Sequence, residues 1–98
     1  MKTNIATMQS NSTENLFELI EGCRRGDHRA QLKVYKLYYR PVLRYCMTIV
    51  RDAFVAEHIM RESFMLAFEN ISSYSGDASF STYVADFIKN IYKNDNNR

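Results

Sequence analysis

The sequence has little of what secreted, membrane-embedded or disulfide-rich chains contain. Its 98 residues include no tryptophan, one proline, three glycines and two cysteines. No apolar run approaches the roughly 20 residues that a membrane-spanning helix needs. The polar N-terminus also lacks the apolar centre of a signal peptide. We therefore expect a cytoplasmic chain with no membrane insertion.

The cysteines and histidines predict neither a disulfide, nor a metal site, nor catalysis. Cys23 and Cys46 have no C-x-x-C spacing and fall on apolar helix faces, so we interpret them as reduced thiols in the core. His28 and His58 are far apart, and no second ligand stands three or four residues from His58. The chain also lacks a nucleophile–histidine set and a phosphate-binding loop. We expect no enzyme, no cofactor and no metal.

The N-terminal residues are polar and precede a short apolar helix. Residues 1–12 are unpatterned and rich in Asn, Ser and Thr, so we expect them to be disordered. The rest, residues 13–95, is long enough for one small helical domain. Ser12 or Thr13 can cap a first helix. Its apolar stripe is spaced i, i+3, i+4, i+7 and consists of Leu16, Leu19, Ile20 and Cys23.

A second, longer helix is predicted over about 27–51, with Asp27 as its N-cap. Pro41 lies inside the apolar pattern and removes one backbone donor. Since the pattern continues on both sides, we expect a kink at Pro41 and not a break. The predicted core face consists of Val34, Leu37, Tyr38, Pro41, Val42, Tyr45, Cys46 and Ile49.

Two further helices follow, separated by a polar loop over 72–78. Asp52 can cap the third helix, about 53–71, and Ser79 with Thr82 opens the fourth. No alternating strand pattern occurs, so we expect an all-α, compact bundle of three to four helices. The inner face of the third helix is Ala56, Ile59, Met60, Ser63, Phe64, Ala67, Phe68 and Ile71. The fourth helix would bury Phe80, Val84, Phe87, Ile88 and Ile91.

Positive charge is concentrated in the middle of the chain. Residues 24–51 carry a net charge of +7, whereas residues 1–23 carry −2 and residues 52–98 carry −3. The second helix has almost no acidic partners at i±4, which a solvated helix surface tends to have. Three interpretations stay open: a solvated surface, a phosphate-tracking surface, or a docking surface for an acidic protein. The predicted basic face is Lys33, Lys36, Arg40 and Arg44, with Arg51 close to it.

The segment 56–90, AEHIMRESFMLAFENISSYSGDASFSTYVADFIKN, contains two motifs. It resembles region 2 of bacterial RNA polymerase sigma factors, in particular the small extracytoplasmic-function (ECF) class. In that class a run similar to D-A-E-D-I-V-Q-E-x-F precedes a loop and then A-S-F-x-T-W-L-x-x-I-A-x-N. The chain matches the first motif at Ala56, Glu57, Ile59, Glu62 and Phe64. It matches the second at Ala78, Ser79, Phe80, Thr82, Ile88 and Asn90.

The resemblance implies that the outward face of the third helix docks on the clamp helices of the largest polymerase subunit. Glu57 and Glu62 stand at acidic positions of the family motif. His58 replaces a common aspartate, Arg61 replaces a common glutamine, and Val55 replaces another aspartate. The implied RNA polymerase-binding residues are Glu57, His58, Arg61 and Glu62.

The resemblance also implies that the loop and the fourth helix contact the non-template strand of the promoter −10 element. Tyr74 is the candidate stacking ring, and Tyr83 takes the position of the family's tryptophan. Asp86 stands where the family is often basic or aromatic, and residues 72–98 are neutral overall. The implied DNA-binding residues are Ser73, Tyr74, Gly76, Ser79, Tyr83, Lys89, Asn90 and Lys93.

The resemblance covers residues 14–98 and lacks region 4, the second helical domain of ECF factors. The chain is therefore expected to be either a natural short protein or a domain of a longer factor. The leading hypothesis is a transcription initiation module with RNA polymerase core and promoter DNA as partners. The alternative is a sigma-like interaction domain that binds an anti-sigma factor or another regulator without contacting DNA; His58, Arg61 and the neutral 72–98 segment favour it.

Overall fold

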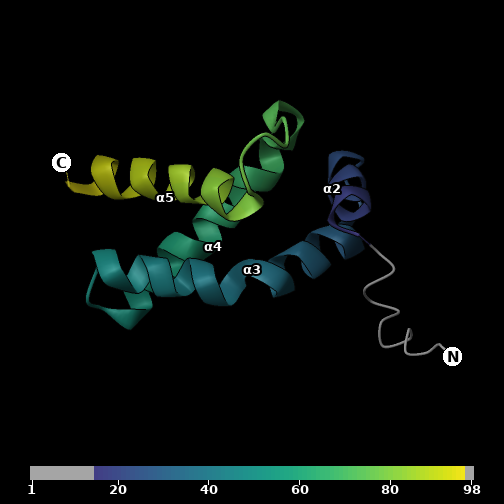
Figure 1. Cartoon of the computed structure of the whole chain (residues 1–98). Coiled ribbons are helices and arrows are strands. Elements are labelled where there is room, and N and C mark those ends of the chain that lie inside the picture. The colour runs from purple at the N-terminus through teal and green to yellow at the C-terminus, as the bar shows by residue number, and fades with distance from the viewer. Residues whose placement is uncertain (1–14, 97–98) are drawn as a thin grey trace, which may run out of the picture. The chain divides into compact units, whose positions relative to one another are not determined.

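The computed structural model describes residues 15–96, which form four α-helices and one short 3-10 helix (Figure 1). No strand occurs in this range, which confirms the all-α class. None of the described helices is long and apolar enough to cross a membrane. The elements are α2 (Leu16–Arg24), α3 (His28–Ile49), α4 (Ala53–Glu69), η1 (Ile71–Ser73) and α5 (Phe80–Asn96). The chain divides into two units, residues 1–34 and 35–98, with the boundary inside α3.

Helix α2 begins after Asn15, whose side-chain oxygen accepts a hydrogen bond from the Glu18 N–H at 2.8 Å. The prediction that Ser12 or Thr13 caps this helix is therefore wrong. Asparagine is as good an N-cap as serine, and it directly precedes the apolar stripe. The predicted disorder of residues 1–12 lies outside the described residues.

The turn between α2 and α3 depends on two glycines. Gly26 has a φ of 81°. Its N–H donates to Cys23 O at 3.0 Å, and the Asp27 N–H donates to Gly22 O at 2.9 Å. This pair of bonds is a Schellman motif, which needs a left-handed residue at its centre. A Cβ at Gly22 would stand 2.7 Å from the Ala30 Cβ, so the absent side chain permits this close approach.

Helix α3 begins directly after Asp27, its predicted N-cap. The Asp27 Oδ1 accepts a hydrogen bond from the Arg29 N–H at 2.9 Å. The helix continues through Pro41, as the sequence predicts, and ends at Ile49; the kink at Pro41 stays a prediction. Two members of the predicted core face, Leu37 and Pro41, are exposed, so their assignment is wrong. They stand four residues apart on one edge of the apolar stripe, and that edge faces solvent.

Helix α4 packs mainly against α5 and is the best predicted element. Asp52 Oδ1 accepts from the N–H groups of Phe54 and Val55 at 2.9 and 3.2 Å, which confirms the cap. The buried hydroxyl of Ser63 donates to Ile59 O at 2.7 Å, so no polar atom is left unsatisfied there. The other predicted inner-face residues are buried except Phe68, which is half-buried.

Phe80, the first residue of α5, lies at the centre of an aromatic cluster and is 0% exposed. Its ring centroid lies 5.4 Å from that of Tyr38, 6.2 Å from that of Phe68 and 5.7 Å from that of Tyr74. The cluster joins α3, α4, the loop and α5 within residues 35–98. Val84 and Ile88 continue the buried face of α5, as predicted. The packing of this core thereby determines which faces of α4 and α5 lie at the surface.

Candidate functional site

The outward face of α4 carries one ion pair and one histidine–carboxylate contact, each between residues four apart. Arg61 Nη1 lies 3.1 Å from Glu57 Oε2, and His58 Nε2 lies 3.4 Å from Glu62 Oε1. All four side chains remain about half exposed or more. The predicted polymerase-binding residues thus share one accessible face, and each acidic residue already has a basic neighbour on its own helix. Exposed pairs of this kind contribute little to stability, about 0.3–0.5 kcal/mol each.

Two exposed apolar side chains lie beyond the ends of this charged quartet, which sequence reasoning missed. Phe54 is 85% exposed and stands four residues before His58. Met65 is 56% exposed and stands four residues after Arg61. The i, i+4 spacing puts both on the same side of α4 as the quartet. That spacing was visible in the sequence, and it extends the face beyond the charged residues.

The loop between α4 and α5 is tied together by its own side chains. The Ser73 hydroxyl donates to Asn70 O at 2.7 Å, and the Tyr74 hydroxyl donates to Ala78 O at 2.6 Å. Gly76 adopts a φ of 91°, a conformation that glycine reaches without the strain that a side chain would cause. The Ser79 hydroxyl oxygen accepts from the Thr82 N–H at 3.2 Å and so begins α5. These bonds give the loop a defined shape.

Two of the predicted DNA-contacting aromatic residues meet at the start of α5. The ring centroids of Tyr74 and Tyr83 are 4.7 Å apart, and Phe87 meets Tyr83 edge-on at 5.2 Å. Both tyrosines are half-buried. Each ring therefore has an accessible part for a ligand and a packed part that supports the fold.

The polar candidates on α5 are exposed and lie farther along the helix. Lys89 and Lys93 are four residues apart and follow one another on the helix surface. Asn90 shares its side of α5 with Tyr83, and Asp86 stands between them. The structure thus brings Tyr74 and Tyr83 together, while the two lysines lie more than one helical turn beyond Tyr83.

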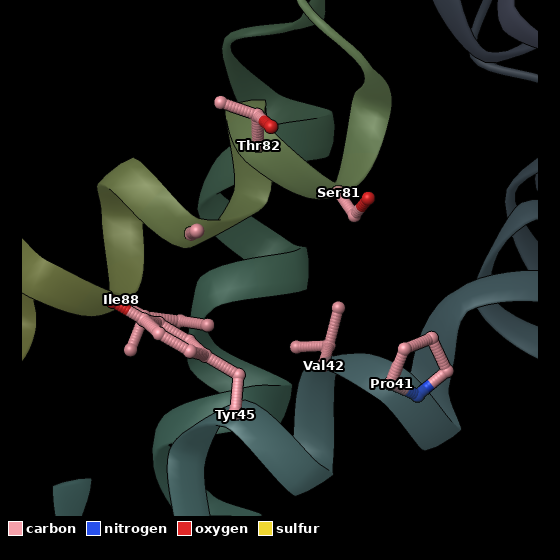
Figure 2. A pocket seen from close by; sticks show the side chains of 7 residues that line it. Pro41, Val42, Tyr45, Ser81, Thr82 and Ile88 are labelled. Carbon is pink, nitrogen blue, oxygen red and sulfur yellow. The ribbon is translucent and has the colours of Figure 1, made fainter. Parts of the chain in front are cut away.

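A groove of about 280 Å³ lies between α3 and α5, and no sequence pattern indicated it. Figure 2 shows side chains from both helices arranged around it. Most of its lining is apolar, with two hydroxyl groups from the first turn of α5. It results from the packing of two helices distant in sequence, so no local motif encodes it. Its lining residues are Pro41, Val42, Tyr45, Ser81, Thr82, Ala85 and Ile88.

The predicted basic face lies on α3 and is exposed. Lys33, Lys36, Arg40 and Arg44 all have exposed side chains, as does Arg51. Arg51, however, follows the end of α3 and is not part of that helix.

Both cysteines are free and buried, as predicted. Burial raises the pKa of the Cys23 thiol to about 11, and the negative charge of Asp27 adds to the effect. Burial alone raises the pKa of Cys46 to about 11. Thiols with such pKa values are poor nucleophiles at neutral pH. Within residues 15–96, no group of three or more His, Cys, Asp or Glu side chains could hold a metal ion.

The family comparison matches residues 34–95 to the model described as Sigma-70 region 2. This range contains α4, the loop, most of α3 and nearly all of α5. The chain belongs to the sigma-70 region 2 family. The resemblance of segment 56–90 to sigma region 2 is thereby confirmed.

A curated relative agrees with this family. The chain is 30% identical over 77 residues to the RNA polymerase sigma-H factor of Pseudomonas aeruginosa. The alignment covers 79% of this chain and 40% of that protein, so the chain spans about two fifths of the length of this relative. No solved structure matches the chain.

Proposed function

We propose that this region 2 domain acts in transcription initiation as part of the ECF class. It docks through the outward face of α4 on the clamp helices of the largest RNA polymerase subunit. The loop over 72–80 and α5 then contact the non-template strand of the promoter −10 element. The observation that carries the proposal is the family match over residues 34–95, which includes every residue assigned to the two surfaces.

The geometry of α4 suits docking against another helix. Its inner face is buried and its first turn is capped by Asp52, so the helix is already formed before binding. The outward face presents Glu57 and Glu62, whose carboxylates can accept charge-assisted hydrogen bonds from a basic partner. Phe54 and Met65 supply apolar surface at the two ends of the contact. Charged groups at such an interface set register and association rate.

The loop and α5 suit contact with a single strand of DNA. Tyr74 offers an aromatic ring for stacking, and Gly76 allows close approach of a backbone or base. Ser73 and Ser79 add hydroxyl groups, while Asn90, Lys89 and Lys93 are exposed along α5. Lysines there can pair with phosphates of the strand.

A titration against the isolated clamp coiled coil of the cognate polymerase tests docking. Glu62→Lys reverses one charge on the exposed face, so we expect at least tenfold weaker binding with unchanged helicity. Asp86→Lys makes the same charge change on the exposed surface of α5 and should leave clamp binding unchanged. Equal affinities of the Glu62→Lys variant and the parent chain would contradict the docking face.

A second candidate function is supported by the side-chain pairs on α4. Because Glu57 is already paired with Arg61 and Glu62 already lies beside His58, the face can serve a partner other than polymerase. That partner would be an anti-sigma factor or another regulator, bound without DNA contact. The salt dependence of single-stranded DNA binding separates the two functions, because only a DNA-binding chain loses affinity steeply with added salt.

A further inference from the structure

The exposed side of α3 carries three cations that the proposed function does not use. Lys36, Arg40 and Arg44 stand at i, i+4 and i+8 and are all exposed; we call them the α3 cationic row. No acidic residue occurs between Asp27 and Asp52 in the sequence. Among residues 15–96, no ion pair involves a member of the row, whereas Glu57 and Glu62 on α4 pair with their own helix. The row therefore presents uncompensated positive charge.

The spacing of the row suits a nucleic acid strand. Residues four apart on a helix are separated by about 6 Å along its axis. A strand of B-form DNA carries one phosphate charge per roughly 3.4 Å of its axis. The row, about 12 Å long, can therefore run beside about four phosphates of one strand. An acidic helix with carboxylates four residues apart would match the same spacing, so the aromatic groups beside the row decide between the two occupants.

An aromatic stack ends at the middle of the row. The ring of Tyr35 meets Phe64 edge-on at 4.9 Å and stacks on Tyr39 at 5.6 Å with an interplanar angle of 16°. The guanidinium of Arg40 lies 5.9 Å from the Tyr39 ring centroid, and its Nε lies 3.4 Å from the Tyr39 hydroxyl oxygen. Phe64 is buried, so the stack is anchored in the core and ends at an exposed planar cation. Guanidinium planes and tyrosine rings are the groups on which unpaired bases stack.

We propose that this side of α3 is a second binding surface for single-stranded nucleic acid, separate from the loop over 72–80. Lys36 and Arg44 hold the phosphate backbone, and one base stacks at the Tyr39–Arg40 end of the aromatic stack. The surface has no base-edge hydrogen-bonding set, so it binds without sequence preference. Together with the loop over 72–80, it gives this region 2 domain a longer surface on which to bind one separated DNA strand.

Fluorescence anisotropy with a labelled oligothymidylate of about 12 nucleotides tests the charge component, since single-strand sites cover roughly 4–16 nucleotides. The triple variant Lys36→Gln/Arg40→Gln/Arg44→Gln should bind at least tenfold more weakly. The slope of log affinity against log salt should decrease by about 1.4, because Lys36 and Arg44 each make one phosphate contact that contributes roughly 0.7. The matched control Arg25→Gln/Arg29→Gln/Arg51→Gln removes three exposed charges outside the row. It should change affinity less than threefold.

An abasic strand of the same length tests the stacking component. The parent chain should bind this strand about tenfold more weakly than oligothymidylate, since one stacked base is lost. The Tyr39→Leu variant should bind the intact strand more weakly than the parent chain does and should prefer it less over the abasic strand, because the ring of Tyr74 in the loop remains for stacking. Circular dichroism checks that the variant remains folded. Titration with polyglutamate tests the competing occupant, an acidic polypeptide.

Three results would overturn the proposal. The first is equal strand binding by the triple variant and its control, and the second is equal affinity of the parent chain for the abasic and intact strands. The third is polyglutamate binding as tight as oligothymidylate at the same salt concentration. Because the row lies outside the α4 face, the triple variant also keeps its clamp binding if the proposed docking is right. A wrong assignment of the α3 cationic row can therefore be distinguished from a wrong assignment of the α4 docking face.

Discussion

The hydroxyl of Tyr83 in α5 lies 2.9 Å from the carbonyl oxygen of Asn70, the C-cap residue that follows α4. It also lies 3.1 Å from the carbonyl oxygen of Ala67 in the last turn. The last carbonyl groups of a helix have no partner within the helix, and Tyr83 supplies one from the next helix. The bond joins the two ends of the loop over which the proposed DNA contact extends.

Replacing Tyr83 with phenylalanine removes this bond and keeps the ring. We expect the free energy of unfolding to fall by about 1 kcal/mol, the usual net value of one such hydrogen bond. Urea unfolding followed by circular dichroism measures the change. Tyr92→Phe is the matched control, because Tyr92 is half-buried on α5 and its hydroxyl has no hydrogen-bond partner within residues 15–96. Equal unfolding free energies for the two variants would contradict the role of the hydroxyl.

Tyr83 also shows what the sequence could not reveal. The resemblance assigned it to DNA contact at the family's tryptophan position, and its hydroxyl supports the fold by a bond across 13 residues. The groove beside Val42 and Ile88 likewise depends on two helices distant in sequence. By contrast, the helix over 53–69 and its cap at Asp52 were predictable, because a cap and a helical apolar stripe are local signals.

Leu37 and Pro41 were wrongly assigned to the core face of α3 for the same reason, because their burial depends on helices distant in sequence. A periodic stripe gives the direction of the core but not its width, which depends on how far the neighbouring helices reach around α3. The exposure of both residues was therefore not readable from the pattern. The loop bond from Tyr74 to Ala78 also has no sequence signature.

Gly26 should tolerate asparagine better than alanine. Its φ of 81° lies in the left-handed region, where a Cβ costs roughly 1–2 kcal/mol in most residues and less in asparagine. No atom lies within 4 Å of an added Cβ, so the cost is conformational and not steric. Thermal or urea unfolding should show the parent chain as the most stable, Gly26→Asn as less stable and Gly26→Ala as the least stable. A Gly26→Ala variant as stable as the parent chain would exclude the Schellman turn.

The buried thiols predict a loss of stability at alkaline pH. The pKa of Cys46 rises on folding from 9.0 to about 11, so the thiol stays protonated to a higher pH in the folded state than in the unfolded state. The contribution of the buried Cys46 thiol to the free energy of unfolding is fully present below pH 9 and is lost as pH rises from about 9 to 11. Each pKa unit corresponds to about 1.4 kcal/mol.

A comparison of the parent chain with Cys46→Ala isolates this contribution, since the two proteins have all other side chains in common. Urea unfolding at several pH values from 8 to 11 should show a smaller decrease for Cys46→Ala, by about 2–3 kcal/mol over the whole range. Parallel curves for the two proteins would mean that the thiol keeps the same pKa in the folded and unfolded states.

Tyr74 combines a structural bond with the proposed stacking role, and two variants separate them. Tyr74→Phe removes only the hydroxyl that donates to Ala78 O, so strand binding should remain while stability falls slightly. Tyr74→Leu removes the ring that packs on Tyr83 and should weaken binding of a −10 non-template oligonucleotide by about 1–3 kcal/mol. Anisotropy titrations at a temperature where both variants are folded measure the difference. If the phenylalanine variant binds as weakly as the leucine variant, the hydroxyl and the loop shape it holds determine binding, and the ring does not stack on a base.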